Sequence, residues 1–242
     1  MKLQAHDEQH DTKWQDAFTR REPALIVGAT GNFERVMKWT PSLIAARHAS
    51  MPCKVARDGR PVLSEEMSTY AQFFQGTGQE KPLAESTYTF TRRTYDPNER
   101  AFIEDFDFPN PYFIEADIER HIVYAGPAKA GALPHAHGDA LNFLVSGTKR
   151  WILFDASPDA PGQPLADHYW QTYGEGATWE TWYAAEYEKL RAAKDVTLFE
   201  FEQHAGDLVY VPAKFAHTVV NLSPVLGIVI ERRRTIESPN TR

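Results

Sequence analysis

The second half of the chain is dominated by short strand-like segments separated by glycine and proline turns, and this pattern restricts the fold more than any other feature. Each segment is apolar or alternates apolar with polar residues, which is typical of a β-strand. The segments are Ile118–Gly126, Asn142–Phe154, Val196–Phe201, Asp207–Pro212, His217–Leu222 and Val225–Arg232. Because many short strands can bury their apolar faces together only in a sandwich or a barrel, we expect a mainly β fold.

One of these segments, Asn142–Phe154, contains Ser146, Gly147 and Thr148 between two apolar runs. A short glycine-containing turn between two such runs typically joins the strands of a β-hairpin. The sequence therefore predicts a hairpin that turns at Gly147.

Helices are predicted in the first half of the chain. Residues 33–49 have helical spacing, and Thr40 can cap a helix whose first turn contains Pro41. Another helix is predicted for residues 67–76, where Gly76 ends it.

The chain is expected to form one domain with a helical insertion. Residues 1–21 form a polar lead-in, residues 22–242 the domain, and residues 155–195 approximately the insertion. Within the insertion, Trp179–Lys194 is predicted to be a helix with Thr178 as its N-cap.

Composition limits the location and the partners of the protein. The net charge is -7, which argues against a nucleic-acid partner and against an acidic membrane surface. The single cysteine excludes an internal disulfide framework and fits a reducing compartment. No apolar run approaches the roughly 20 residues that a membrane helix needs. We therefore expect a cytoplasmic protein that has no membrane partner.

Two histidines and an aspartate stand at alternate positions in the stretch P-H-A-H-G-D: His135, His137 and Asp139. Alternate residues of a strand point to the same side, so His135 and His137 can face one point, and Asp139 joins them if the strand continues through Gly138. Two imidazoles and a carboxylate on one face of a metal are typical of non-haem Fe(II) oxygenases. His217, in G-D-L-V-Y-V-P-A-K-F-A-H, can supply a remote ligand from another strand.

Three motifs in this order carry a family resemblance. They are H-x-D at His137–Asp139, N-x-x-x-x-G-x-K-R-W at Asn142–Trp151, and G-D-x-x-x-x-P-x-x-x-x-H-x-x-x-N at Gly206–Asn221. With them the chain resembles the JmjC and cupin-like (cupin_8) oxygenases that depend on Fe(II) and 2-oxoglutarate, over roughly residues 20–232. The resemblance implies a double-stranded β-helix, or jelly roll, with N-terminal helices and a helical insertion between strands.

The resemblance also implies cofactors and the residues that bind them. Fe(II) would be held by the H-x-D…H triad His137, Asp139 and His217. The distal carboxylate of 2-oxoglutarate would pair with Lys149, and Asn142 would lie near this co-substrate. A buried dianion needs a fixed cation, so the role of Lys149 is also reasonable on physical grounds.

The spacing of these residues leaves a second ligand set open. The number of residues between the first histidine and Lys149 favours His135 and His137 as the pair of ligands on the strand. Together with His217 they give a site of three histidines. The H-x-D motif favours His137 and Asp139. If Asp139 is not a ligand, its Gly-Asp context is ordinary turn chemistry.

The resemblance implies an oxygenase, most simply a hydroxylase of a peptide or protein side chain or of a small metabolite, which releases succinate and CO2. No catalytic residue is expected beyond the metal site. One alternative is a metal-dependent cupin enzyme that does not use 2-oxoglutarate, which a three-histidine site with an outward Lys149 would favour. The other is a non-catalytic JmjC-like binding protein. A homodimer is compatible with the resemblance.

Two further interpretations concern the surroundings of the site. The aromatic stretch Trp170–Tyr187 either packs in the core or walls the substrate entrance. If it walls the entrance, replacing Trp182 with alanine should alter substrate affinity and leave iron binding intact. The charged run Glu231–Arg234 indicates either a solvated basic edge at the end of the last strand or an inward arginine that meets an acidic substrate.

Overall fold

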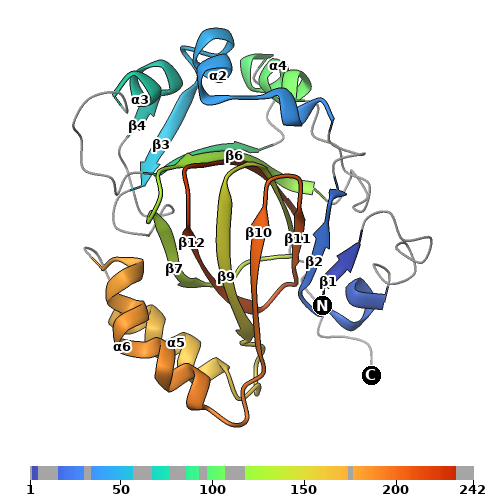
Figure 1. The fold of residues 1–242 in the computed structure, drawn as a ribbon, viewed down its shortest axis with the longest axis vertical. Coiled ribbons are helices and arrows are strands. Elements are labelled where there is room, and N and C mark those ends of the chain that lie inside the picture. The colour runs from blue at the N-terminus through green and yellow to red at the C-terminus, as the bar shows by residue number, and fades with distance from the viewer. Residues whose placement is uncertain are drawn as a thin grey trace.

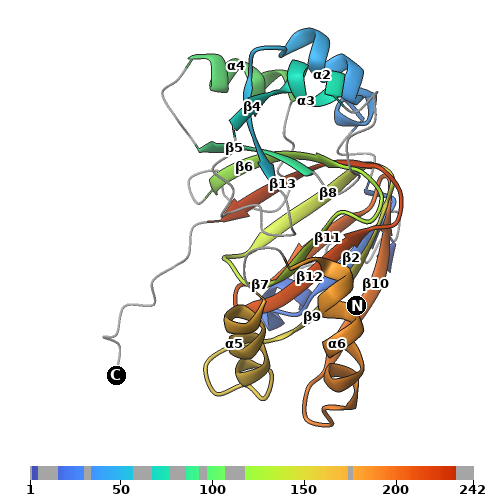
Figure 2. The ribbon, with the colours of Figure 1, turned by 90° about the vertical axis from the view of Figure 1, so that its left-hand side faces the viewer.

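The computed structural model describes residues 2–4, 16–29, 34–56, 67–76, 86–92, 97–106, 118–173 and 177–232. Their strands form two sheets (Figure 1). Seen from the side, the two sheets face each other and draw together toward one end of the molecule (Figure 2).

The larger sheet holds most of the strands. In spatial order it consists of β1 (Lys2–Gln4), β2 (Ala24–Val27), β11 (Leu208–Val211), β8 (Ala140–Ser146), β13 (Val225–Arg232), β6 (Ile118–Gly126), β5 (Ser86–Arg92), β3 (Pro52–Ala56) and β4 (Met67–Thr69). The smaller sheet consists of β10 (Leu198–His204), β9 (Thr148–Asp155), β12 (Phe215–Asn221) and β7 (Gly131–His135). Every described pairing is antiparallel except that of β1 with β2. The prediction of a mainly β, jelly-roll fold is therefore confirmed.

Helices cover the two sheets from outside (Figure 1). Next to the larger sheet lie η2 (Val36–Lys38), α2 (Pro41–Arg47), α3 (Tyr70–Gly76) and α4 (Pro97–Phe106). Between β9 and β10 the chain forms α5 (Gln163–Thr172) and α6 (Trp179–Ala192), which pack against the smaller sheet. None of the helices in the described residues combines the length and the apolar character that crossing a membrane requires.

Both predicted helix caps are confirmed. The side chain of Thr40 accepts a hydrogen bond from the amide of Leu43 at the start of α2. The side chain of Thr178 accepts one from the amide of Thr181 at the start of α6. These bonds satisfy amides that have no partner within the helix.

Two helix predictions need correction. Residues 67–76 do not form one helix, because residues 67–69 belong to β4 and pair with β3, and α3 begins only at Tyr70. Helix α5 lies in a stretch for which no helix was predicted. The division of the chain into a lead-in and a domain stays a prediction, and β1 within the lead-in pairs with β2.

The predicted hairpin at Gly147 is wrong. Strand β8 pairs with β11 and β13 in the larger sheet, whereas β9 pairs with β10 and β12 in the smaller one. Gly147 has a positive φ of 89°, and a Cβ atom there would clash with the carbonyl oxygen of Pro224. The turn therefore carries the chain from one sheet to the other, and the space between the sheets receives side chains from both strands.

Candidate metal centre

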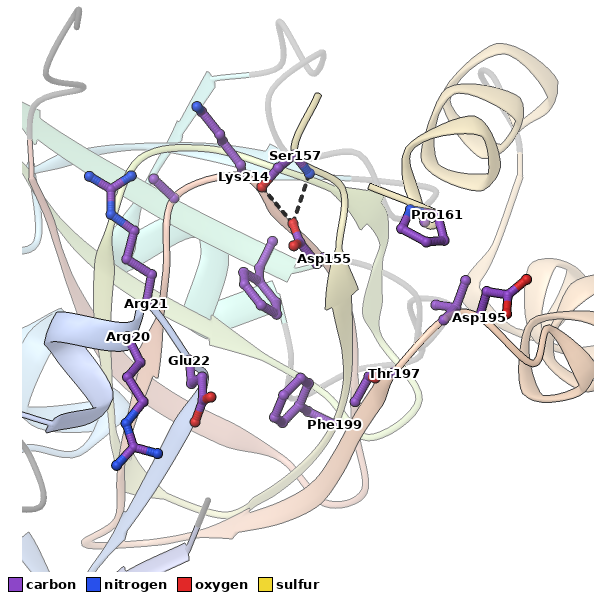
Figure 3. Close-up of a pocket in the computed structure, with 14 residues that line it drawn as sticks. Arg20, Arg21, Glu22, Asp155, Ser157, Pro161, Asp195, Thr197, Phe199 and Lys214 are labelled. Atoms are coloured by element: carbon purple, nitrogen blue, oxygen red, sulfur yellow. Dashed lines mark hydrogen bonds between the residues drawn. The ribbon is translucent and has the colours of Figure 1, made fainter. Parts of the chain in front are cut away.

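A cavity of about 560 Å³ opens at one end of the smaller sheet (Figure 3). Its walls carry charges of both signs, with Arg20, Arg21 and Glu22 on one side and Asp195 on the other. Asp155 in its wall already accepts hydrogen bonds from the amide and hydroxyl of Ser157. No histidine lines this cavity, so despite its size it is not the metal site that the sequence predicts.

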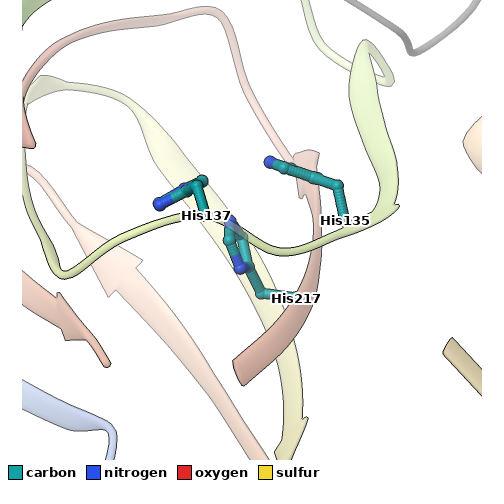
Figure 4. A group of neighbouring side chains, drawn as sticks. All are labelled: His135, His137 and His217. Carbon is teal, nitrogen blue, oxygen red and sulfur yellow. The ribbon is translucent and has the colours of Figure 1, made fainter. Parts of the chain in front are cut away.

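Three histidines meet at a second cavity (Figure 4). His135 is the last residue of β7, and His217 lies directly opposite it in β12. His137 follows in the loop after β7. A ligand nitrogen from each of the three lies within 4.8 Å of the other two. This is the only such group of metal-ligating side chains among the described residues.

Backbone contacts orient all three imidazoles in the same way. Nδ1 of His135 lies 2.8 Å from the Leu133 carbonyl oxygen, and Nδ1 of His137 lies 2.8 Å from that of Gly138. Nδ1 of His217 lies 3.1 Å from the carbonyl oxygen of Phe215. Because a carbonyl can only accept, Nδ1 carries the proton in each ring. The lone pair is then on Nε2, which is the arrangement of histidines that bind a metal.

The site also keeps two of these imidazoles neutral. Burial and the neighbouring His137 together lower the pKa of His135 to about 4. Burial and the other two histidines hold the pKa of His217 well below its usual value. Neutral imidazole is the form that donates to a metal, so near pH 7 these two side chains need not lose a proton to bind one.

Asp139 lies in a different network. Its carboxylate accepts hydrogen bonds from the Tyr210 hydroxyl at 3.1 Å and from the Ala213 amide at 2.9 Å, and it forms an ion pair with Arg232. Asp139 was to join the two histidines only if the strand continued through Gly138, and this condition is not met, since β7 ends at His135. The structure thus brings His135, His137 and His217 together and places Asp139 apart; which residues bind a metal stays a prediction.

The histidine cavity has a volume of about 290 Å³ and lies between the two sheets. Apolar side chains from both sheets form much of its wall, and two residues of the N-x-x-x-x-G-x-K-R-W motif, Asn142 and Lys149, line it as well. The polar and aromatic residues that line it are Arg120, Tyr124, His135, His137, Asn142, Lys149, Trp151, Trp170, His217 and Glu231.

Lys149 is buried in this cavity rather than exposed on a hairpin, with only 4% of its surface accessible. Its Nζ lies 4.1 Å from the centroid of the Tyr124 ring. Tyr124 in turn donates a 2.8 Å hydrogen bond to Asn142 Oδ1. In the described part of the chain no carboxylate lies within ion-pair distance of Nζ, and burial lowers the pKa of Lys149 to about 7. An anion bound beside this amine would favour its charged form.

Glu231 and Arg120 also line the cavity. For Glu231 this differs from the sequence interpretation, which placed it at a solvated edge. Glu231 ends the alternating face of β13 that includes Val229, which lines the same cavity. The charged run at Glu231–Arg234 hid this alternation. Only Glu231 and Arg232 of this run lie within the described residues.

The structure assigns the insertion's tryptophans differently from the entrance interpretation. Trp182 is completely buried in a cluster with Tyr169, Leu133 and Phe154, so it belongs to the core. Trp170 of α5 is 55% exposed and lines the histidine cavity. Of these two, Trp170 is the residue at the cavity's rim.

Other residues of the G-D…P…H…N motif hold the backbone in place. The Asp207 carboxylate accepts hydrogen bonds from the amides of Gly28 at 3.0 Å and His204 at 2.9 Å. The Asn221 side chain donates to the carbonyl of Pro127 at 3.0 Å. Within this motif, therefore, His217 contributes to the cavity while Asp207 and Asn221 fix the neighbouring loops.

No protein-family model matches the chain. It is similar to the bifunctional arginine demethylase and lysyl-hydroxylase psr-1 of Caenorhabditis elegans, with 27% identity over 83% of this chain and 53% of that protein. The lysine-specific demethylase JMJ21 of Arabidopsis thaliana is 23% identical, over 87% of this chain and 23% of that protein. The arginine-specific demethylase JMJ22 of the same plant is 22% identical, over 86% of this chain and 41% of that protein.

The chain therefore spans about half, or less, of the length of these relatives. The similarity supports the resemblance to the JmjC family that the motifs indicate. The narrower cupin_8 assignment stays a prediction.

Proposed function

We propose that this chain is a JmjC-like oxygenase that depends on Fe(II) and 2-oxoglutarate and holds its metal with His135, His137 and His217. The observation that carries the proposal is that three imidazoles, each with Nδ1 against a backbone carbonyl, share one cavity with a buried lysine. The similarity to demethylases and a lysyl-hydroxylase supports the same class of chemistry.

The donor set fits a catalytic metal. Three imidazole nitrogens would hold the metal and would leave positions for both a co-substrate and O2, as such a catalytic metal requires. When bound, Fe(II) and 2-oxoglutarate would supply the oxidising chemistry, in which 2-oxoglutarate becomes succinate and CO2 and the substrate is hydroxylated.

The chain's own side chains would bind and orient the co-substrate. The ammonium of Lys149 would pair with the distal carboxylate of 2-oxoglutarate, because a charge-assisted bond to an anion compensates for the burial of the amine. The Tyr124 hydroxyl and Asn142 would hold the lysine's surroundings rigid through their mutual hydrogen bond. The apolar walls formed by Val211, Val219 and neighbouring residues would keep water away.

For the substrate we propose a peptide or protein side chain, and a small metabolite as the alternative within the same chemistry. The names of the relatives, which describe enzymes acting on arginine and lysine, support the protein side chain. Trp170, exposed at the rim of the cavity, would contact whichever group enters.

One observation favours a second candidate, a metal-dependent cupin enzyme that does not use 2-oxoglutarate. The three-histidine set lacks the carboxylate that is usual in 2-oxoglutarate oxygenases, and it is also a common catalytic zinc site. The inward position of Lys149 argues for the first candidate, since an enzyme without an anionic co-substrate has no need for a buried cation.

An anaerobic titration tests the proposal. Purified apo-protein receives Fe(II) and then 2-oxoglutarate, and the visible spectrum is recorded. We expect a weak charge-transfer band that needs both additions, is absent in His217→Ala, and is retained in His204→Ala, which changes an exposed histidine of β10. Metal binding without the band would favour the second candidate. A folded wild-type protein that binds no metal would contradict both.

A further inference from the structure

A metal held by three neutral histidines keeps its whole charge. In the facial triad of two histidines and one carboxylate, the carboxylate neutralises part of that charge and strengthens binding. The site proposed above lacks this ligand, so the question is whether another carboxylate takes over its electrostatic role.

Asp139 is not available for this role in the structure. Its two oxygens are engaged by the Tyr210 hydroxyl, the Ala213 amide and the Arg232 guanidinium. Its donors come from Tyr210 in β11, from Ala213 just after that strand and from Arg232 in β13. Asp139 does not belong to the group of ligand atoms that His135, His137 and His217 form.

Glu231 is the one acidic side chain among the described residues that line the cavity. Its Oε1 lies 3.9 Å from Nε2 of His137, the nitrogen that faces the metal position. The side chain is only 13% exposed, so water screens it weakly.

The ion pair of Glu231 with Arg120 is loose. The two residues are cross-strand partners in β13 and β6, and Arg120 Nη1 lies 3.6 Å from Glu231 Oε2. Arg120 also contacts Glu119 at 3.7 Å, so its charge is shared between two carboxylates. The ion pair with Arg120 is made through Oε2, whereas the contact with His137 is made through Oε1.

We propose that Glu231 is the carboxylate of the metal centre: supplied by β13, it stabilises the bound dication from beside the three-histidine face. This inference rests on the proposed function, because it requires a metal at His135, His137 and His217. Glu231 would act through its charge, without being a ligand. It would offset part of the charge of the metal, as an aspartate or glutamate ligand does in the facial triad.

The test measures metal affinity without turnover. Co(II) alone is titrated against a chromophoric chelator, with wild-type protein, Glu231→Gln and Glu119→Gln. Both variants remove one charge and one contact of Arg120, but Glu119 is more exposed and does not line the cavity. We expect Glu231→Gln to weaken Co(II) binding by about 10- to 100-fold, as removal of an outer partner of a metal site does. Glu119→Gln should change it by no more than about twofold.

A further variant guards against a folding artefact. Arg120→Gln removes the cation that shares Glu231, so Co(II) affinity should rise, which a damaged fold does not produce. If Glu231→Gln binds Co(II) with the affinity of the wild type, the inference is overturned. Glu231 would then be expected to bind a cationic group of the substrate. Equal loss of Co(II) affinity in Glu231→Gln and Glu119→Gln would also overturn the inference. Failure of the wild type itself to bind Co(II) would contradict the proposed function, a separate result.

Discussion

Lys149 is the residue whose burial is hardest to explain without a ligand. An ammonium group in an apolar cavity loses its hydration, and the described residues offer it only the faces of Tyr124 and Trp151 in compensation. Function and stability therefore make opposite demands at this position. A protein that only had to fold would place an apolar side chain there.

We expect Lys149→Met to weaken 2-oxoglutarate binding and to stabilise the apo-protein. At pH 7 the free energy of unfolding should rise by about 0.5–2 kcal/mol, and 2-oxoglutarate affinity should fall by about 10- to 100-fold. The folded pKa of about 7 lies below that of an unfolded lysine. The unfolded wild type thus holds an extra proton between about pH 7 and 10, so wild-type stability rises with pH and the difference between the two proteins narrows.

Urea unfolding at several pH values and calorimetric titration of 2-oxoglutarate onto the metal-loaded protein measure both effects. Lys194→Met, at an exposed position after α6, is the matched control and should change neither quantity. Equal 2-oxoglutarate affinity in Lys149→Met and the wild type would remove the lysine from the co-substrate site.

The positions of site residues were predictable from sequence where a motif fixes their spacing. They were less predictable where the direction of a side chain depends on the residue at which a strand ends. His135, His137, His217 and Lys149 all reach one cavity, as their motifs indicate. The position of Asp139 depends on the fact that β7 stops at His135, which no residue in P-H-A-H-G-D signals.

At the scale of elements, strand positions were predictable but strand partners were not. The segments Ile118–Gly126 and Val225–Arg232 are strands with the predicted bounds, because alternation is a local property. The partners of β8 and β9 depend on the turn between them. In sequence Ser-Gly-Thr looks like a hairpin turn, and only the pairings of β8 and β9 with other strands show that it joins two sheets.

This turn gives a prediction about element geometry. Gly147→Ala should destabilise the fold by about 1–3 kcal/mol beyond the backbone strain of a positive φ, because the added methyl clashes with Pro224. It should also weaken 2-oxoglutarate binding, since Lys149 lies two residues further along β9.

Gly28→Ala is the matched control for that change. Gly28 has a φ of 70°, yet a Cβ atom there would meet nothing within 4 Å, so only the strain of about 1 kcal/mol applies. Urea midpoints of the two variants measure the difference. If both variants lose the same stability, the predicted clash between a methyl group at position 147 and Pro224 does not contribute, and this prediction is wrong.

At the scale of the whole molecule, the proposed metal site joins the smaller sheet's β7 and β12 to a loop that leads into the larger sheet. Keeping the imidazoles of His135 and His217 neutral at this junction makes the apo-fold sensitive to acid. His135 has a folded pKa of about 4, and that of His217 is also well below the usual value, whereas both titrate near 6.5 in the unfolded chain. Between these values the unfolded state binds more protons than the folded state.

The stability of the apo-protein should therefore fall as the pH drops from about 6.5 to about 4, by at most about 1.4 kcal/mol per pH unit for each of the two histidines. Urea unfolding across this range measures the slope, and the variant with both His135→Asn and His217→Asn should show a shallower one. Bound metal should add stability above about pH 6 and lose that effect over the same range, because protons then compete with it for Nε2. Parallel slopes in the two proteins would mean that other groups carry the acid sensitivity, and that the imidazoles are not held neutral by the fold.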